Sequence, residues 1–163
     1  MDYLSIAEAR KRRGLRLVAV LFADHPIAPE ALKELKDAGF AGVMLDTANK
    51  AGGALPRLLA GSAVARFTDE ARARGLLTGL AGSLGRDDIP GLLPYEPDYL
   101  GFRGALCRSG RAGRLDPDRV RAVRRAIPEG GLQAVSASAA AGAQRAAQAL
   151  ISSVPSNSAP KSR

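Results

Sequence analysis

Two side chains that could exchange a proton lie four positions apart in the segment DTANK. Asp46 directly follows the apolar run AGVML, and Lys50 ends the segment. A carboxylate and an amine at this separation can share protons, and a lysine amine whose pKa is lowered by burial or a neighbouring cation can attack a carbonyl carbon. The same two residues could instead form a loop ion pair that contributes little. The spacing makes Asp46 and Lys50 candidate catalytic residues and leaves both interpretations open.

Two glycine-bearing segments could hold a phosphate group. Gly82 and Ser83 lie in LAGSL, and Gly104 lies in FRGAL, each just after an apolar run. Such loops can bring backbone N–H groups and a hydroxyl around phosphate oxygens, and paired loops after neighbouring strands form the usual phosphate site of α/β barrels. The alternative is that both segments are ordinary tight turns. Gly82, Ser83 and Gly104 are therefore candidate phosphate-binding residues.

Three further side chains have suitable chemistry but an ambiguous context. Arg103 could clamp an anion with two hydrogen bonds, or it could pair with Asp98 or Asp116. His25, the single histidine, lies in a loop, where we expect a solvated ring. Cys107 has no histidine nearby in the sequence, so we expect a buried thiol rather than a nucleophile.

Strands and helices alternate around these candidates. Four apolar runs predict strands at Leu15–Phe22, Ala41–Leu45, Gly75–Ala81 and Asp98–Phe102. Helices are predicted after Pro29, from about Ser62 to Arg74, in a short turn capped by Asp87 or Asp88, and from Pro117 to Ile127 with Asp116 as the N-cap. This alternation indicates an α/β fold with parallel strands, in which ligands bind beyond the carboxyl ends of the strands. Asp24 lies at that edge with the candidates named above.

The length limits how much of a barrel the chain can form. A complete (βα)8 barrel needs about 250 residues, whereas this chain has 163. We therefore expect a partial TIM barrel of about four βα units over residues 15–131, preceded by a short helix at 1–14. An alanine- and serine-rich tail at 132–163 is expected to be flexible. The run LRLVAVLF lacks polar alternation, which predicts a strand covered on both faces.

The composition limits the kinds of ligand and partner that the chain is expected to bind. The net charge of +8 comes from 24 basic and 16 acidic residues, and many arginines lie in two zones, 10–16 and 103–125. Such zones attract nucleic acid or phosphorylated metabolites, but an aromatic content of 4% argues against stacking on single strands. One cysteine excludes an internal disulfide and a zinc site of several cysteines. With no apolar segment of spanning length and no signal-peptide pattern, we expect a cytoplasmic protein that binds neither membrane, metal nor nucleic acid.

Four segments in order resemble the (5-formylfuran-3-yl)methyl phosphate synthase family of methanofuran biosynthesis. They are VAVLFAD, GVMLDTANKAGG, GLLTGLAGSL and PDYLGFRGALC, followed by LDPDRV. The resemblance covers about Leu15 to Ile127 and corresponds to the second half of that family's barrel.

The resemblance implies a lyase that condenses two molecules of glyceraldehyde 3-phosphate into a phosphorylated furan aldehyde through lysine imine chemistry, without a cofactor. Lys50 would then act in proton transfer, Asp46 would orient it, and Gly82, Ser83 and Gly104 would hold phosphate. The family's Schiff-base lysine belongs to the early half of the barrel, which precedes the matching region. We therefore expect a homo-oligomer or a complementary half-barrel chain. The alternative is a non-catalytic remnant that binds sugar phosphate, and a third hypothesis is nucleic-acid binding through the arginine zones.

Overall fold

The computed structural model describes residues 15–128. The chain divides into two compact units, Met1–Ile127 and Pro128–Arg163, and the description below concerns the first. The helix predicted at 1–14 and the tail predicted at 132–163 lie outside the described residues. Within residues 15–128, no helix is long and apolar enough to cross a membrane.

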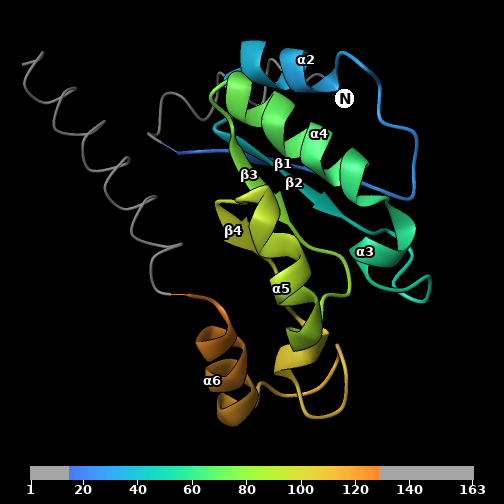
Figure 1. Cartoon of the computed structure of the whole chain (residues 1–163), viewed down its shortest axis with the longest axis vertical. Helices are drawn as coiled ribbons and strands as arrows, with labels where there is room; N and C mark the ends of the chain where they lie inside the picture. Colours follow the sequence, from blue (N-terminus) through green and yellow to red (C-terminus); the bar gives the residue numbers. More distant parts are fainter. Residues whose placement is uncertain (1–14, 129–163) are drawn as a thin grey trace, which may run out of the picture. The chain divides into compact units, whose positions relative to one another are not determined.

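A four-stranded parallel sheet forms the centre of this unit (Figure 1). Its strands are β1 (Val18–Phe22), β2 (Gly42–Asp46), β3 (Leu77–Leu80) and β4 (Tyr99–Leu100), and their order in space is their order in the chain. The predicted parallel α/β fold is therefore confirmed. All four strands direct their carboxyl ends to one edge of the sheet, where sequential loops gather.

The fourth strand is shorter than the sequence predicts. The carboxylate of Asp98 accepts a hydrogen bond from the N–H of Thr78 at 2.7 Å, in place of a backbone carbonyl. The N–H of Asp98 donates to the carbonyl of Thr78 at 2.9 Å, but the strand itself begins only at Tyr99 and covers two residues. The N–H of Gly101 still donates to the carbonyl of Leu80 at 2.8 Å, which continues the alignment towards the carboxyl edge.

Helices connect the strands. They are α2 (Ala31–Asp37), α3 (Leu55–Leu58), α4 (Gly61–Ala73), α5 (Ile89–Leu92) and α6 (Pro117–Ala126), with 3₁₀ turns η1 (Arg86–Asp88), η2 (Leu93–Tyr95) and η3 (Gly104–Leu106). Asp116 caps α6 as predicted, because its carboxylate accepts from the N–H of Asp118 at 2.9 Å. The capping prediction for Asp88 was wrong in detail, since that carboxylate accepts from the N–H of Gly85 at 2.7 Å and makes no cap for α5.

The core lies between the sheet and the helices on one of its faces. One cluster joins Leu32 and Leu35 of α2 to Val43 of β2 and Ala71 of α4. A second cluster is centred on the carboxyl half of the sheet and contains Leu45, Leu55, Val64, Leu80, Leu84 and Leu92. Figure 1 shows α2 and α4 lying along the same side of the sheet. This packing fixes the strand ends that carry the loops described below.

The opposite face of β1 is open. Its side chains alternate between half-buried and exposed, and Val18, Val20 and Phe22 are 37%, 46% and 41% exposed. The prediction that this strand is covered on both faces is therefore wrong for the described unit. Because the pairing edge of β1 away from β2 is also unoccupied within residues 15–128, an apolar face and a strand edge remain available together.

Candidate functional site

A cavity of about 530 Å³ lies at the carboxyl edge of the sheet, among the loops that follow β2, β3 and β4. All six residues singled out as candidates line it: Asp46, Lys50, Gly82, Ser83, Arg103 and Gly104. They come from three separate stretches of the chain. The parallel sheet brings them together because its strand ends are adjacent.

Lys50 and Asp46 form an ion pair on one side of this cavity. The Lys50 Nζ lies 2.5 Å from Asp46 Oδ1, and the two side chains are 28% and 25% exposed. The same carboxylate oxygen accepts the N–H of Thr47 at 2.7 Å. The amine therefore has a proton acceptor in direct contact, while both groups remain open to a ligand in the cavity.

Asp24, at the carboxyl end of β1, holds the loop that carries Lys50. Its two carboxylate oxygens accept the N–H groups of Ala48 and Asn49 at 2.8 and 2.7 Å. These backbone hydrogen bonds hold the pKa of the Asp24 carboxyl below its ordinary value. Asp24 does not line the cavity, so its contribution at this edge is made through the loop.

The loop after β3 is interlocked with the loop after β2. Gly82 has φ +103°, and a Cβ built there would lie only 2.7 Å from the Cγ2 of Thr47, so this position requires glycine for both reasons. The hydroxyl of Ser83, itself at φ +49°, donates to the carbonyl of Lys50 at 3.3 Å. The Ser83 hydroxyl proton is thus directed to the lysine loop.

Several backbone donors along the cavity have no acceptor among residues 15–128. They are the N–H groups of Gly82, Ser83, Leu84, Gly104 and Ala105. Unpaired N–H groups of consecutive residues are the donors that bind phosphate or carboxylate oxygens. The two glycine-bearing loops can therefore supply an anion site built mainly from backbone.

Two arginines add positive charge to the cavity. Arg103 lines it and makes no ion pair within the described part of the chain, because Asp98 accepts from Thr78 and Asp116 pairs with Arg108 at 3.0 Å. The alternative that paired Arg103 with Asp98 or Asp116 is therefore wrong.

Arg111 also lines the cavity and was not singled out from the sequence. Its loop folds back because Cys107 and Leu115 form an antiparallel bridge. The sequence feature that could have indicated Arg111 is the pair of flanking glycines, Gly110 and Gly113, because glycines mark a turn that can expose the side chain between them.

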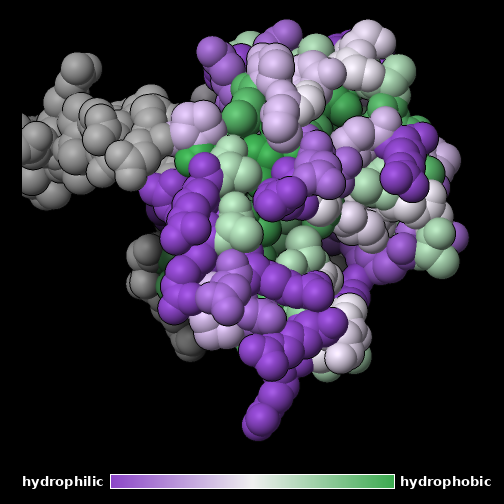
Figure 2. Space-filling view, turned by 60° about the horizontal axis from the view of Figure 1, so that its bottom comes forward, coloured by the Kyte–Doolittle hydropathy of each residue, from purple (hydrophilic) through white to green (hydrophobic). Residues whose placement is uncertain are grey.

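Other arginines of this zone make internal contacts. Arg119 donates to the carbonyl of Cys107 at 2.7 Å, and Arg121 pairs with Asp118 at 2.5 Å. Figure 2, in which the lower end of Figure 1 comes forward, shows hydrophilic side chains gathered there, with hydrophobic residues between them. Arg119 and Arg121 at this end therefore make contacts within the fold, whereas Arg103 and Arg111 line the cavity.

His25 and Cys107 are not cavity residues. The exposed His25 ring lies 6.1 Å from the ring of Phe22, centroid to centroid, and Cys107 is fully buried, as expected. Within residues 15–128, no three His, Cys, Asp or Glu side chains are grouped so that they could hold a metal ion.

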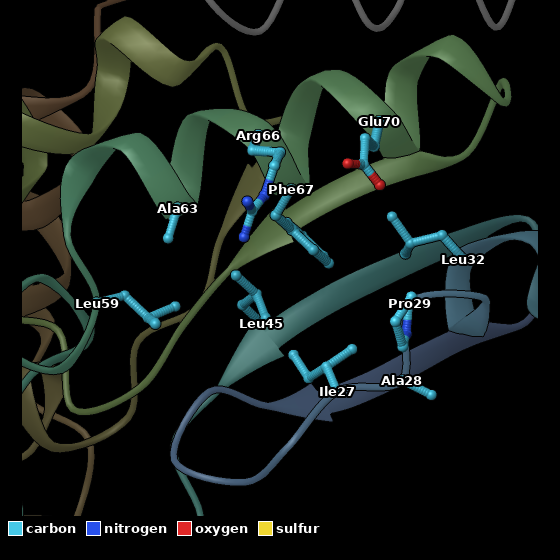
Figure 3. Close-up of a pocket in the computed structure, with 10 residues that line it drawn as sticks. All are labelled: Ile27, Ala28, Pro29, Leu32, Leu45, Leu59, Ala63, Arg66, Phe67 and Glu70. Atoms are coloured by element: carbon cyan, nitrogen blue, oxygen red, sulfur yellow. The ribbon is translucent and has the colours of Figure 1, made fainter.

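A second cavity, of about 430 Å³, lies between α2 and α4 over the helix-covered face of the sheet (Figure 3). Leu45 and Phe67 extend into it, and Arg66 and Glu70 project from α4 above it. The surrounding side chains are mainly apolar: Ile27, Ala28, Pro29, Leu32, Leu59 and Ala63. None of the six candidate residues lies there, so the two cavities are chemically distinct.

Comparisons with known proteins give the family of the chain. Residues 2–124 match the sequence pattern of the family described as 4-HFC-P synthase. The chain belongs to this family. A Methylorubrum extorquens protein named as a candidate (5-formylfuran-3-yl)methyl phosphate synthase is 47% identical over 120 residues, which are 73% of this chain and 51% of that protein. The (5-formylfuran-3-yl)methyl phosphate synthase of Methanocaldococcus jannaschii is 41% identical over 91 residues, 55% of this chain and 39% of that protein.

The comparison with solved structures finds a barrel of similar fold. Phosphoribosyl anthranilate isomerase from Thermus thermophilus superposes with a TM-score of 0.55 at 20% identity, over 76% of this chain and 55% of that one. This likeness concerns the fold alone, and it agrees with four consecutive units of a (βα)8 barrel. The chain spans about half or less of the length of the two synthases named above.

Proposed function

We propose that this member of the 4-HFC-P synthase family forms the phosphate-binding and proton-transferring half of a synthase. The reaction proposed is the condensation of two molecules of glyceraldehyde 3-phosphate into a phosphorylated furan aldehyde through a lysine imine, with release of phosphate and water. Lys50 transfers protons, and Asp46 orients its amine and exchanges protons with it. The imine-forming lysine belongs to the other half of the barrel.

The observation that supports this proposal is that a lysine–carboxylate pair and a row of backbone N–H donors line one cavity. The Lys50–Asp46 pair lines the same 530 Å³ space as the N–H groups of Gly82, Ser83 and Gly104, which have no acceptor among residues 15–128. A triose phosphate held by its phosphate at the glycine loops would leave its carbon chain free to extend towards the lysine. The cavity size and its small number of cationic side chains favour a phosphorylated small molecule over nucleic acid.

Phosphate binding can be tested on this chain alone. Arg103→Gln and Arg111→Gln should each weaken the binding of glyceraldehyde 3-phosphate by about tenfold, because each removes a charge-assisted contact to phosphate. Titration followed by amide NMR reports both affinity and location, and Arg121→Gln serves as the control because Arg121 pairs with Asp118 on α6. Shifts that avoid residues 82–84 and 104–105 would contradict the anion site.

The open face of β1 supports the proposal that further barrel units cover it. We assign that role to a complementary half-barrel of four βα units, whose strands would continue the sheet from the free edge of β1 and bury Val18, Val20 and Phe22. Val20→Lys should prevent this association, whereas Val120→Lys on α6 should not, although Val120 is similarly exposed at 40%. Sedimentation of the chain alone and mixed with the unmatched half of the Methylorubrum extorquens relative separates this pairing from association with a second copy.

Turnover distinguishes a synthase half from a sugar-phosphate-binding remnant. In the mixture with the complementary half, Lys50→Met should abolish formation of the furan aldehyde. Lys33→Met should retain it, because Lys33 forms a comparable i,i+4 ion pair with Asp37 on the exposed side of α2, away from the cavity. Borohydride reduction followed by mass spectrometry should trap a substrate adduct on the complementary half. Ligand binding without product or adduct in the assembled wild-type mixture would support the non-catalytic alternative.

A further inference from the structure

The loop from Ala48 to Gly53 receives little support from packing. Ala48, Asn49, Ala51 and Gly52 are exposed, whereas Thr47 before the loop and Ala54 and Leu55 after it are buried. Hydrogen bonds must therefore define the loop conformation between these buried anchors. Lys50 lies in the middle of this segment, so the position of its amine depends on them.

Two hydrogen bonds within the loop are local. The side chain of Asn49 accepts the N–H of Ala51 at 3.0 Å, and the carbonyl of Asn49 accepts the N–H of Gly52 at 3.2 Å. These contacts shape a turn but do not attach it to the rest of the molecule. Attachment comes from Asp24, which binds two successive N–H groups, and from the longer Ser83 contact at 3.3 Å.

We propose that Asp24 is a positioning residue for Lys50, acting by fixing the Ala48–Asn49 backbone so that the lysine amine remains against Asp46 and at the cavity. Both oxygens of the Asp24 carboxylate are engaged, one with each amide, which restrains the orientation of the loop as well as its distance from β1. Asp24 lies 24 positions before Ala48 and 25 before Asn49, and the pairing of β1 with β2 brings them together. The consequence for catalysis rests on the function proposed above for Lys50, whereas the consequence for loop geometry does not.

The first test measures the loop and needs no substrate. In Asp24→Ala the amides of Ala48 and Asn49 should exchange with solvent about tenfold faster, because they lose their acceptors. Labelling of Lys50 by an amine-reactive reagent, followed by peptide mass spectrometry, should rise in the same variant. Asp37→Ala is the matched control, since it removes another exposed carboxylate that pairs with Lys33 on α2.

The second test separates positioning from a general loss of structure. Asp24→Asn keeps one carbonyl acceptor and should restore part of the exchange protection and part of the normal Lys50 reactivity. In the mixture with the complementary half, Asp24→Ala should lower kcat about tenfold or more. KM for glyceraldehyde 3-phosphate should change little, because the proposed phosphate site lies in the loops after β3 and β4. The midpoint of urea unfolding should stay near that of the control.

The outcomes discriminate between the two proposals. Unchanged exchange at residues 48 and 49 together with unchanged Lys50 labelling in Asp24→Ala would overturn the positioning role, whatever the enzyme does. Changed exchange and labelling in a protein whose wild-type form shows no turnover would support the positioning role and refute the proposed synthase activity instead. A KM effect as large as the kcat effect would assign Asp24 to substrate binding and also overturn the proposal.

Discussion

The contact between the loops after β2 and β3 can be tested by adding a single methyl group at Gly82. Alanine at this position would have to adopt φ +103°, and its Cβ would lie 2.7 Å from Thr47 Cγ2 and 3.1 Å from the backbone nitrogen of Thr47. The backbone strain costs about 1–3 kcal/mol. Forcing the two loops apart costs about another 1–3 kcal/mol, as in other overpacked sites. We therefore expect Gly82→Ala to lose about 2–6 kcal/mol of unfolding free energy in total, the sum of these two ranges.

Two other glycines provide matched controls. Gly39 has φ +82° with nothing within 4 Å of its built Cβ, so Gly39→Ala should show the strain alone, about 1–2 kcal/mol. Gly91 lies in α5 without positive φ and also has open space around it, so Gly91→Ala should be neutral or stabilise by about 0.5–1 kcal/mol. Urea unfolding followed by circular dichroism measures all three variants on one scale.

The double variant with Thr47→Ala isolates the steric component. Removing Cγ2 eliminates the nearer contact, so the combined loss should be smaller than the sum of the single losses by about 0.5–3 kcal/mol. If Gly82→Ala is no more destabilising than Gly39→Ala, the two loops are not in close contact and the interlock described above is refuted. Phosphate affinity should fall with Gly82→Ala and remain unchanged with Gly39→Ala.

Three further outcomes follow from the structure. Leu45→Ala should lose about 2–5 kcal/mol in urea unfolding, because this side chain is 1% exposed in the cluster beneath the site. The fold lowers the pKa values of Asp24 and Asp116 below 3.8 through hydrogen bonds from backbone N–H groups. Their local stabilising contribution is therefore complete above that value and is lost as the pH falls through the lower folded pKa, which amide NMR at residues 48 and 118 should reveal as local loosening only below pH 3.8. Cys107 should react with a thiol reagent only on unfolding, because it is fully buried, and rapid labelling of the native protein would contradict this.

The strand order and the six clustered candidates follow from patterns that the sequence displays directly. Apolar runs separated by amphipathic helices predict parallel strands, and parallel strands place their following loops at one edge. Asp46, Lys50, Gly82 and Gly104 reach one cavity for this reason alone. This reasoning requires no knowledge of side-chain contacts.

The pairing of individual charged groups could not be predicted in the same way. Arg103 had two acidic residues within reach in the sequence, but Asp98 is engaged by Thr78, and Asp116 is engaged by Arg108 and by its capping bond. These choices depend on backbone groups exposed by the strand end and the helix start, which have no signature in residue spacing. The link from Asp24 to the lysine loop is also non-local.

The prediction that β1 is covered on both faces failed for a different reason. An apolar run predicts that both faces of a strand favour burial, but it does not identify the part of the chain or the partner chain that packs on each face. Here α2 and the core cover one face, while Val18, Val20 and Phe22 remain exposed on the other. The apolar pattern of β1 therefore favours burial of both faces, and residues 15–128 bury only one of them.

Contacts at Thr47 and Ser83 join the loop after β3 to the loop after β2, which carries Lys50. Gly82 approaches Thr47 so closely that no side chain fits between them, and Ser83 donates to the carbonyl of Lys50. The N–H of Ser83 has no acceptor within the described chain, so an anion bound there would restrain the same residue that holds the lysine loop. The proposed phosphate site and the loop that carries Lys50 therefore share Ser83, whereas the two hydrogen bonds to Asp24 come from the Lys50 loop alone.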